Sequence, residues 1–247
     1  MSASIVVLTK YPEIIHAWTQ EYQRFPSEGT PVYVYSDGAP PDAHPKYHIS
    51  GPRPFIAACN VNLGMHAVWP NDVLLCCDDA VFTQPQTLER LQALAEAHPE
   101  YGIISPAIEG EVCFGGQKKG VFEGQTIVEL DALANVCCYI KRKVIESIGG
   151  WDERFTQYGW DDVDYGLRAR LAGWKLGVAP GIVVKHGYGD YASGASYMMT
   201  AKETGKDIGL AHNTSLFVNK WKHAMHVIHD FKPAYLGGLL REAHNGI

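Results

Sequence analysis

The stretch Asp72-Val-Leu-Leu-Cys-Cys77 is almost entirely apolar and is followed at once by Asp78 and Asp79. A short apolar run of this kind is typical of a strand buried on both faces of a parallel sheet. Two carboxylates directly after such a strand cost free energy unless a positive group lies beside them. A divalent cation with a nucleotide pyrophosphate would meet that need, because Mg²⁺ and Mn²⁺ prefer oxygen ligands. The alternative is an acidic turn before the helix expected near Pro85.

The residues on either side of this strand alternate between strand-like and helix-like patterns. Strands are expected at 5–8, 32–35, 72–77 and 102–105, and helices at 12–25, 55–68 and 85–98. This alternation predicts an α/β fold with a parallel sheet wrapped by helices. Ligands of such sheets bind beyond the carboxyl ends of the strands. Thr9, Asp37, Asp78 and Asp79 each follow a predicted strand, so we expect them to meet at one edge.

The second half of the chain is less regular. Strands are expected at 135–140 and 174–185, and helices at 143–148 and 161–172. The segment 187–209 is rich in Gly, Ser and Tyr, a composition that suggests a lid, and an amphipathic helix follows it. In that last segment His223, His226 and His229 recur every three residues. A solvated helix face explains this spacing better than a metal site, because no third ligand accompanies them.

Composition excludes several classes of protein. The chain has 247 residues, 21 basic against 27 acidic, and a net charge of −6, so no broad nucleic-acid-binding face is expected. No apolar run approaches the roughly 18–20 residues of a membrane span, and no basic leader precedes the short apolar start. The six Cys form no CxxC pair and are expected to be reduced. We therefore expect a cytoplasmic protein.

A second group of acids follows Gly149-Gly-Trp-Asp-Glu-Arg-Phe155, at the predicted start of a helix. Asp161, Asp162 and Asp164 lie within four residues, and crowded like charges raise at least one pKa, which suits a carboxylate that must accept a proton. Asp164 precedes Arg168 by four residues, which predicts an ion pair. An ordinary acidic helix start is the alternative. His186, at the end of the last predicted strand, would complement carboxylate and phosphate oxygens around Mn²⁺.

Taken in order, these motifs resemble the family-2 glycosyltransferases with the GT-A fold, over roughly residues 4–190. The resemblance rests on Val6-Val-Leu-Thr9, Ser36-Asp-Gly38, Ala58-Cys-Asn-Val-Asn-Leu-Gly64, Cys76-Cys-Asp-Asp-Ala-Val-Phe82, Gly149-Gly-Trp-Asp-Glu-Arg-Phe155, Trp160-Asp-Asp-Val-Asp164, Gly173-Trp174 and His186. Two departures stand out. Cys77 occupies the place of a first Asp or Asn, and Asp161 replaces the usual Glu.

The resemblance implies a role for each matching residue. Nucleotide contacts are implied for Thr9, Tyr11, Asp37, Arg53, Asn60 and Asp78. Asp79 and His186 would hold Mn²⁺ or Mg²⁺. Asp162 would be the general base, with Asp161 holding the acceptor. Trp151, Asp152 and Trp160 would bind the acceptor.

The resemblance also implies the organisation and the activity of the chain. A single GT-A domain, Rossmann-like with a mixed, mostly parallel sheet flanked by helices and a C-terminal helical tail, would span residues 1–247. Residues 1–104 would bind the nucleotide-sugar, 105–190 the acceptor, and 191–247 would form the lid loop and C-terminal helix. The expected activity is the metal-dependent transfer of a sugar, with inversion, from a nucleoside diphosphate donor to a hydroxyl group. The expected donor is a UDP-sugar, and the expected acceptor is a saccharide. A non-catalytic sugar- or nucleotide-binding protein with the same fold is the alternative.

Overall fold

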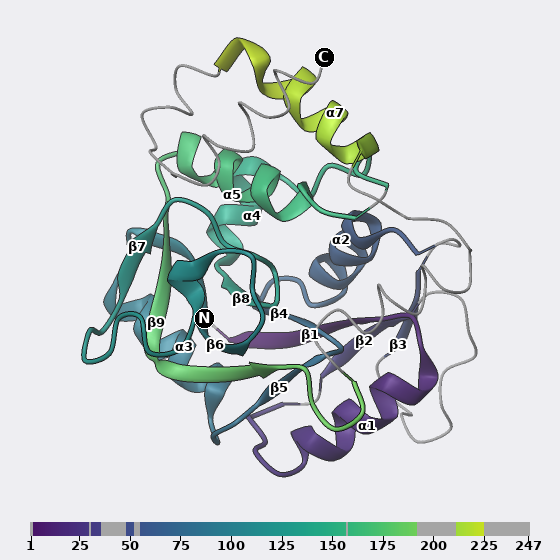
Figure 1. The fold of residues 1–247 in the computed structure, drawn as a ribbon, viewed down its shortest axis with the longest axis vertical. Coiled ribbons are helices and arrows are strands. Elements are labelled where there is room, and N and C mark those ends of the chain that lie inside the picture. Colours follow the sequence, from purple (N-terminus) through teal and green to yellow (C-terminus); the bar gives the residue numbers. More distant parts are fainter. Residues whose placement is uncertain are drawn as a thin grey trace.

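The computed structural model describes residues 2–29, 31–35, 48–51, 55–156, 158–191 and 211–224. Its centre is a nine-stranded sheet with the order β3-β2-β1-β4-β8-β6-β9-β5, to which β7 adds by pairing with β9. The strands from one edge of the sheet to its middle, β3 to β4 in this order, come from the first half of the chain. Most of the strands beyond them come from the second half, as Figure 1 shows.

Most strands of the sheet run in one direction. The strands β1 (Ala3–Thr9), β2 (Val32–Tyr35), β3 (His48–Ser50), β4 (Asp72–Cys77), β6 (Tyr101–Gly110) and β9 (Lys175–His186) share that direction. The strands β5 (Ala80–Phe82), β7 (Val128–Leu130) and β8 (Cys137–Ile140) run against it. The prediction of a mixed, mostly parallel sheet is confirmed.

Helices cover both faces of the sheet. On one face lie α1 (Pro12–Tyr22) and α3 (Thr87–Ala97), and on the other α2 (Ala57–Ala67), α4 (Arg142–Ile148) and α5 (Asp161–Leu171). The helix α7 (Ala211–Trp221), continued by the short η2 (Lys222–Ala224), packs on α5 on the side away from the sheet (Figure 1). A second short helix, η1 (Gly115–Gln117), lies between β6 and β7.

The alternation of side chains along β1 explains why both faces are covered. Ile5 and Val7 belong to the core beneath α1 and α3, whereas Val6 and Leu8 belong to the core beneath α2, α4 and α5. Successive side chains of a strand point to opposite faces, so an uninterrupted apolar strand needs a helix layer on each side. Leu74 and Leu75 of β4 divide in the same way.

The predicted elements all exist, and three short strands were not predicted. β3 and β7 are three residues each, and β5 is Ala80-Val-Phe82 directly after the acidic pair. Such short segments carry too few residues for a periodic pattern to show. All six cysteines are free, in agreement with the expected reduced state. No helix within the described ranges is long and apolar enough to cross a membrane.

Candidate functional site

The carboxyl ends of β1 and β4 lie side by side and bring the first predicted residues together. The two strands pair in parallel, with Leu8 opposite Cys77. Thr9 is the last residue of β1, and its hydroxyl donates a hydrogen bond of 2.9 Å to Oδ2 of Asp78, which follows β4. Both side chains are buried. The expected meeting of polar residues at this edge is therefore present for Thr9 and Asp78.

Asp79 meets His186 because β5 pairs antiparallel with β9 and sets Ala80 opposite His186. Nε2 of His186 lies 3.4 Å from Oδ2 of Asp79, while Nδ1 faces the carbonyl oxygen of Glu111. A carbonyl only accepts hydrogen bonds, so Nδ1 carries a proton and Nε2 is turned toward the carboxylate. Burial lowers the pKa of His186, but the hydrogen bond and charge of Asp79 outweigh it and raise the pKa.

Two residues directly after β9 bind the backbone of the Asp78-Asp79 turn. The Tyr188 hydroxyl lies 2.8 Å from the carbonyl oxygen of Asp78 and 3.0 Å from that of Ile14. The Gly187 amide donates a 2.7 Å hydrogen bond to the Asp79 carbonyl, and Gly187 has a φ of +88°, a conformation that suits glycine. Tyr188 thus fixes the acidic turn, a role that the Gly- and Tyr-rich composition of its segment did not reveal.

Asp79 and His186 form a carboxylate–imidazole pair. Within the described parts of the chain, no three His, Cys, Asp or Glu side chains are grouped as ligands of a metal ion. A carboxylate oxygen and an imidazole nitrogen suit Mn²⁺, and phosphate oxygens commonly fill the remaining positions around such ions. The hydrogen bond from Nδ1 to a carbonyl is the arrangement that orients a metal-binding imidazole. The pair therefore fits a divalent cation that is shared with a phosphate.

The second acidic cluster lies at the start of α5. Asp162 accepts two backbone hydrogen bonds, from the Asn135 amide to Oδ2 at 3.1 Å and from the Val163 amide to Oδ1 at 2.8 Å. Burial raises the pKa of Asp162 against the effect of these two bonds. Burial and then the charge of Asp162 raise the pKa of Asp161. A fixed carboxylate with a raised pKa suits a group that accepts a proton near neutral pH.

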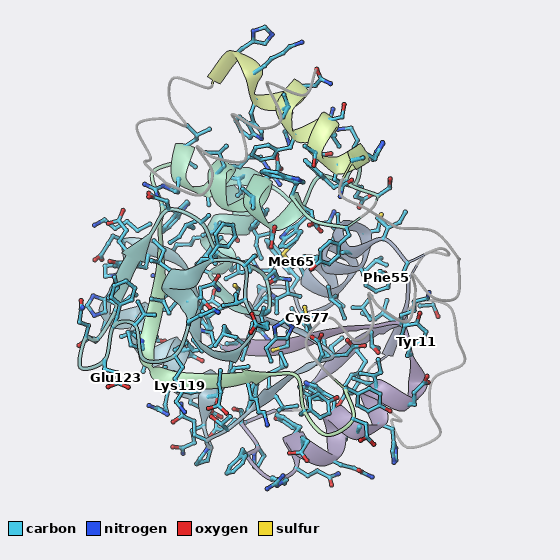
Figure 2. All side chains as sticks on the ribbon, in the orientation of Figure 1. Tyr11, Phe55, Met65, Cys77, Lys119 and Glu123 are labelled. Atoms are coloured by element: carbon cyan, nitrogen blue, oxygen red, sulfur yellow. The ribbon has the colours of Figure 1, made fainter. Side chains whose placement is uncertain are left out.

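Asn135 connects the two clusters. Its carbonyl oxygen accepts a 2.9 Å hydrogen bond from the thiol of Cys77, the residue before the Asp78-Asp79 turn, and its amide donates to Asp162. Cys77 is labelled near the centre of Figure 2. The buried side chain of Gln117 holds the preceding residue, Ala134, by hydrogen bonds to its amide (2.7 Å) and its carbonyl (3.1 Å). No sequence pattern indicates Asn135 or Gln117, since Asn135 binds through its own backbone and Gln117 binds the backbone of a loop.

Tyr158 lies within electrostatic reach of both clusters. Burial, and then charges that include those of Asp162 and Asp79, raise the pKa of its phenol. The residue nevertheless keeps 52% of its surface exposed. An exposed aromatic ring beside two groups of carboxylates is a suitable surface for a sugar ring.

The two tryptophans predicted to bind the acceptor pack into the protein. Trp151 stacks on Tyr165 at 5.4 Å between ring centroids and is 5% exposed. Trp160 packs against Phe217 of α7 at 4.5 Å, and its indole donates a 2.8 Å hydrogen bond to Thr214. Little of either ring is therefore left for an acceptor to contact.

Asp152 is an ion-pair partner of Arg154 and Lys220, at 2.5 and 2.7 Å, and these bonds lower its pKa. Asp164, fully buried, bonds Arg168 at 3.1 Å as the i,i+4 spacing predicted, and also bonds Lys220 and Trp221 of α7. These acids therefore fix α7 to the segment that carries Asp162.

The remaining predicted residues divide between described and undescribed parts of the chain. Tyr11, labelled in Figure 2, is buried just before α1, and Asn60 is buried within α2. The neighbouring Asn62 holds the Trp151 backbone by hydrogen bonds of 2.7 and 3.0 Å. Asp37, Arg53, His226, His229 and most of the segment 187–209 lie outside the described residues.

No protein-family model and no curated protein matches the sequence. Solved structures do match. GalNAc-T7, solved with UDP, GalNAc and Mn²⁺, matches 78% of this chain with a TM-score of 0.59 at 14% identity. S. aureus TarS matches 90% with a TM-score of 0.55 at 14% identity. The chain has a GT-A fold.

The GT-A match covers only part of the larger proteins. This chain spans 45% of the GalNAc-T7 chain and 43% of the TarS chain. It spans 71% of a TarS fragment, residues 1–349 of that protein, solved with UDP-GlcNAc, with a TM-score of 0.52. The expectation of a GT-A fold is thus confirmed.

Proposed function

We propose that the chain is a glycosyltransferase of the family-2 type, which moves a sugar from a nucleoside diphosphate to a hydroxyl group with inversion. The observation that carries the proposal is the carboxylate of Asp162, held by two backbone amides and linked through Asn135 and Cys77 to the Asp78-Asp79 turn. This arrangement sets a proton acceptor beside a candidate phosphate-binding edge. UDP is the first candidate donor nucleotide, since it is present in the GalNAc-T7 and TarS structures.

The proposed donor half comprises residues 1–104, and His186 and Tyr188 from the other half complete its site. Asp79 and His186 would hold Mn²⁺ or Mg²⁺, which when bound neutralises charge on the pyrophosphate leaving group. Thr9 fixes the carboxylate of Asp78 by its hydrogen bond, and Tyr188 fixes the backbone of the same turn. These contacts hold the turn in place before the donor binds, so less ordering remains to be done on binding.

The proposed acceptor half comprises residues 105–190. Asp162 would take the proton of the acceptor hydroxyl as that oxygen attacks the anomeric carbon and the bond to the diphosphate breaks. A single displacement of this kind needs no enzyme nucleophile. Tyr158 is the exposed ring that we assign to the acceptor sugar. Trp151 and Trp160 act through packing that holds the Asp162 segment.

UDP release from a panel of UDP-sugars with Mn²⁺ and saccharide acceptors tests this function. We expect release by the unaltered chain, a loss of at least a hundredfold in Asp162→Asn, and full activity in Glu123→Gln, a control that removes an exposed carboxylate. Undiminished release by Asp162→Asn would overturn the assignment of the base. Binding of UDP without release by any form would instead favour the non-catalytic binding protein.

A further inference from the structure

A small cavity lies on the inner side of Asp162. It has a volume of about 20 Å³, and Asp162 lines it together with Asn135, Trp151 and Tyr165, and with apolar side chains of the sheet and Gly166 of α5. A water molecule needs roughly 10–15 Å³ of such space. The cavity therefore has room for one water molecule and none for a sugar.

Three polar atoms of these lining residues are buried and have no hydrogen-bond partner. They are Oδ1 of Asn135, Nε1 of Trp151 and the hydroxyl of Tyr165. An unsatisfied buried polar group destabilises the fold, and a cavity is dry only where its walls are apolar. Three such atoms on residues that line one water-sized space point to an occupant that both donates and accepts.

The donors and acceptors match one water molecule. The Trp151 indole can only donate, the Asn135 oxygen can only accept, and the Tyr165 hydroxyl does either. A carboxylate has about four lone-pair sites, of which the Asn135 and Val163 amides occupy two on Asp162. Lone pairs of the carboxylate beyond those two amides can accept from a water in the cavity and from the acceptor hydroxyl.

We propose that this cavity binds one ordered water, held by Asn135, Trp151 and Tyr165, which donates a hydrogen bond to Asp162 and positions its carboxylate. The role in positioning the base rests on the proposed function, whereas the water site itself does not. Trp151 and Tyr165 are then positioning residues. Their stacked rings fix the indole N–H and the hydroxyl from which the water is held.

Other titratable groups lie near Asp162 and Tyr165 and bear on any pH measurement. Around Asp162 these are Asp161 on α5, Tyr158 in the preceding turn, Cys138 on β8 and Cys113 before η1. Asp164, farther along α5, acts on Asp161. Around Tyr165 they are Arg168 and Arg142. A water that donates to the carboxylate of Asp162 favours its ionised form against burial, which raises its pKa.

Two measurements on the unaltered chain test the water site without any donor. A crystal structure at about 1.5 Å resolution should show density for a water bonded to Nε1 of Trp151 and the hydroxyl of Tyr165. The indole N–H signal of Trp151, assigned by its loss in Trp151→Phe, should shift with pH, and Asp162→Asn should remove that shift. Empty density, or an indole signal that is flat across pH 4–9, would overturn the proposal even if the chain transfers sugar.

Kinetics then test the positioning role. Tyr165→Phe keeps the stacked ring and removes the hydroxyl. We expect kcat to fall roughly tenfold and the KM for the donor to stay unchanged. The acid limb of the pH profile should move to higher pH. Tyr22→Phe removes a hydroxyl that bonds the Ser27 carbonyl beyond the end of α1 and should change none of these. An unaltered kcat and pH profile in Tyr165→Phe would contradict the role in positioning. If the unaltered chain is inactive, the density and the indole signal still decide the water site.

Discussion

The ammonium of Lys220 on α7 lies 2.8 Å from a carboxylate oxygen of Asp164 on α5, and solvent does not reach the Asp164 side chain. The same ammonium lies 2.7 Å from Asp152. Arg168 and the Trp221 indole complete the surroundings of Asp164. One cation therefore joins the C-terminal helix to two acids that flank the candidate base.

Removing this cation should destabilise the chain. Lys220→Met leaves Asp164 buried with less compensation, and we expect a loss of about 3 kcal/mol in the free energy of unfolding, with Lys220→Arg losing less. Urea unfolding followed by fluorescence measures the change. Lys222→Met, which removes an exposed lysine from the adjoining η2, is the matched control and should change little. Equal stability of the Lys220 and Lys222 variants would contradict this account of α7.

The close approach of α2 to β1 gives a second test. A Cβ added at Gly64 would lie 2.4 Å from Cγ1 of Val6, so Gly64→Ala must push the helix from the strand. We expect Gly64→Ala to lower the free energy of unfolding by about 1–3 kcal/mol, as measured by urea unfolding. Val6→Ala removes the atom that the added methyl group would meet first. The double variant should therefore lose less stability than the sum of the losses in the two single variants. Additive losses would show that the contact between Gly64 and Val6 does not determine how closely α2 approaches β1.

The raised pKa of Asp161 predicts a stability change with a definite sign. A carboxyl whose folded pKa lies above its unfolded value of about 4 stabilises the fold at low pH, and that contribution is lost as the pH rises through the folded pKa. Asp161→Asn never ionises, so its Tm should match the unaltered chain near pH 4 and exceed it at pH 8. For a domain of this size the difference should be roughly 2–4 °C for each kcal/mol.

Thermal unfolding between pH 4 and pH 9 measures this difference. Asp190→Asn removes an exposed carboxyl and should give a Tm difference that does not grow with pH. A Tm of Asp161→Asn below that of the unaltered chain at pH 8 would contradict the prediction.

The sequence predicted most of the strands because a strand buried on both faces has to be a continuous apolar run, although β6 continues to Gly110, beyond its predicted end at 105. Thr9 and His186 end such strands, Asp78 and Asp79 follow one, and the pairing of the sheet brings them together. Asn135 was not predicted, since its backbone binds Asp162 and Cys77 and its side-chain type carries no sign of that.

The contacts of α7 were beyond sequence reasoning for another reason. Lys220 and Asp164 are 56 residues apart, and no local pattern pairs residues at that distance. Trp151 and Trp160 were expected to bind the acceptor because of the family resemblance, and the sequence alone does not show whether such a ring is exposed or buried. Their burial comes from Tyr165 and Phe217, which pack against them in the folded chain.

We expect the Asp78-Asp79 edge to bind a nucleoside diphosphate together with a divalent cation. The neighbouring base, Asp162, should not be needed for this binding. Calorimetry of UDP binding with Mn²⁺, for the unaltered chain, Asp79→Ala and Asp162→Asn, tests it most directly. We predict equal affinity for the unaltered chain and Asp162→Asn, and an affinity at least tenfold lower for Asp79→Ala. Undiminished binding by Asp79→Ala, or no binding by the unaltered chain, would contradict the claim.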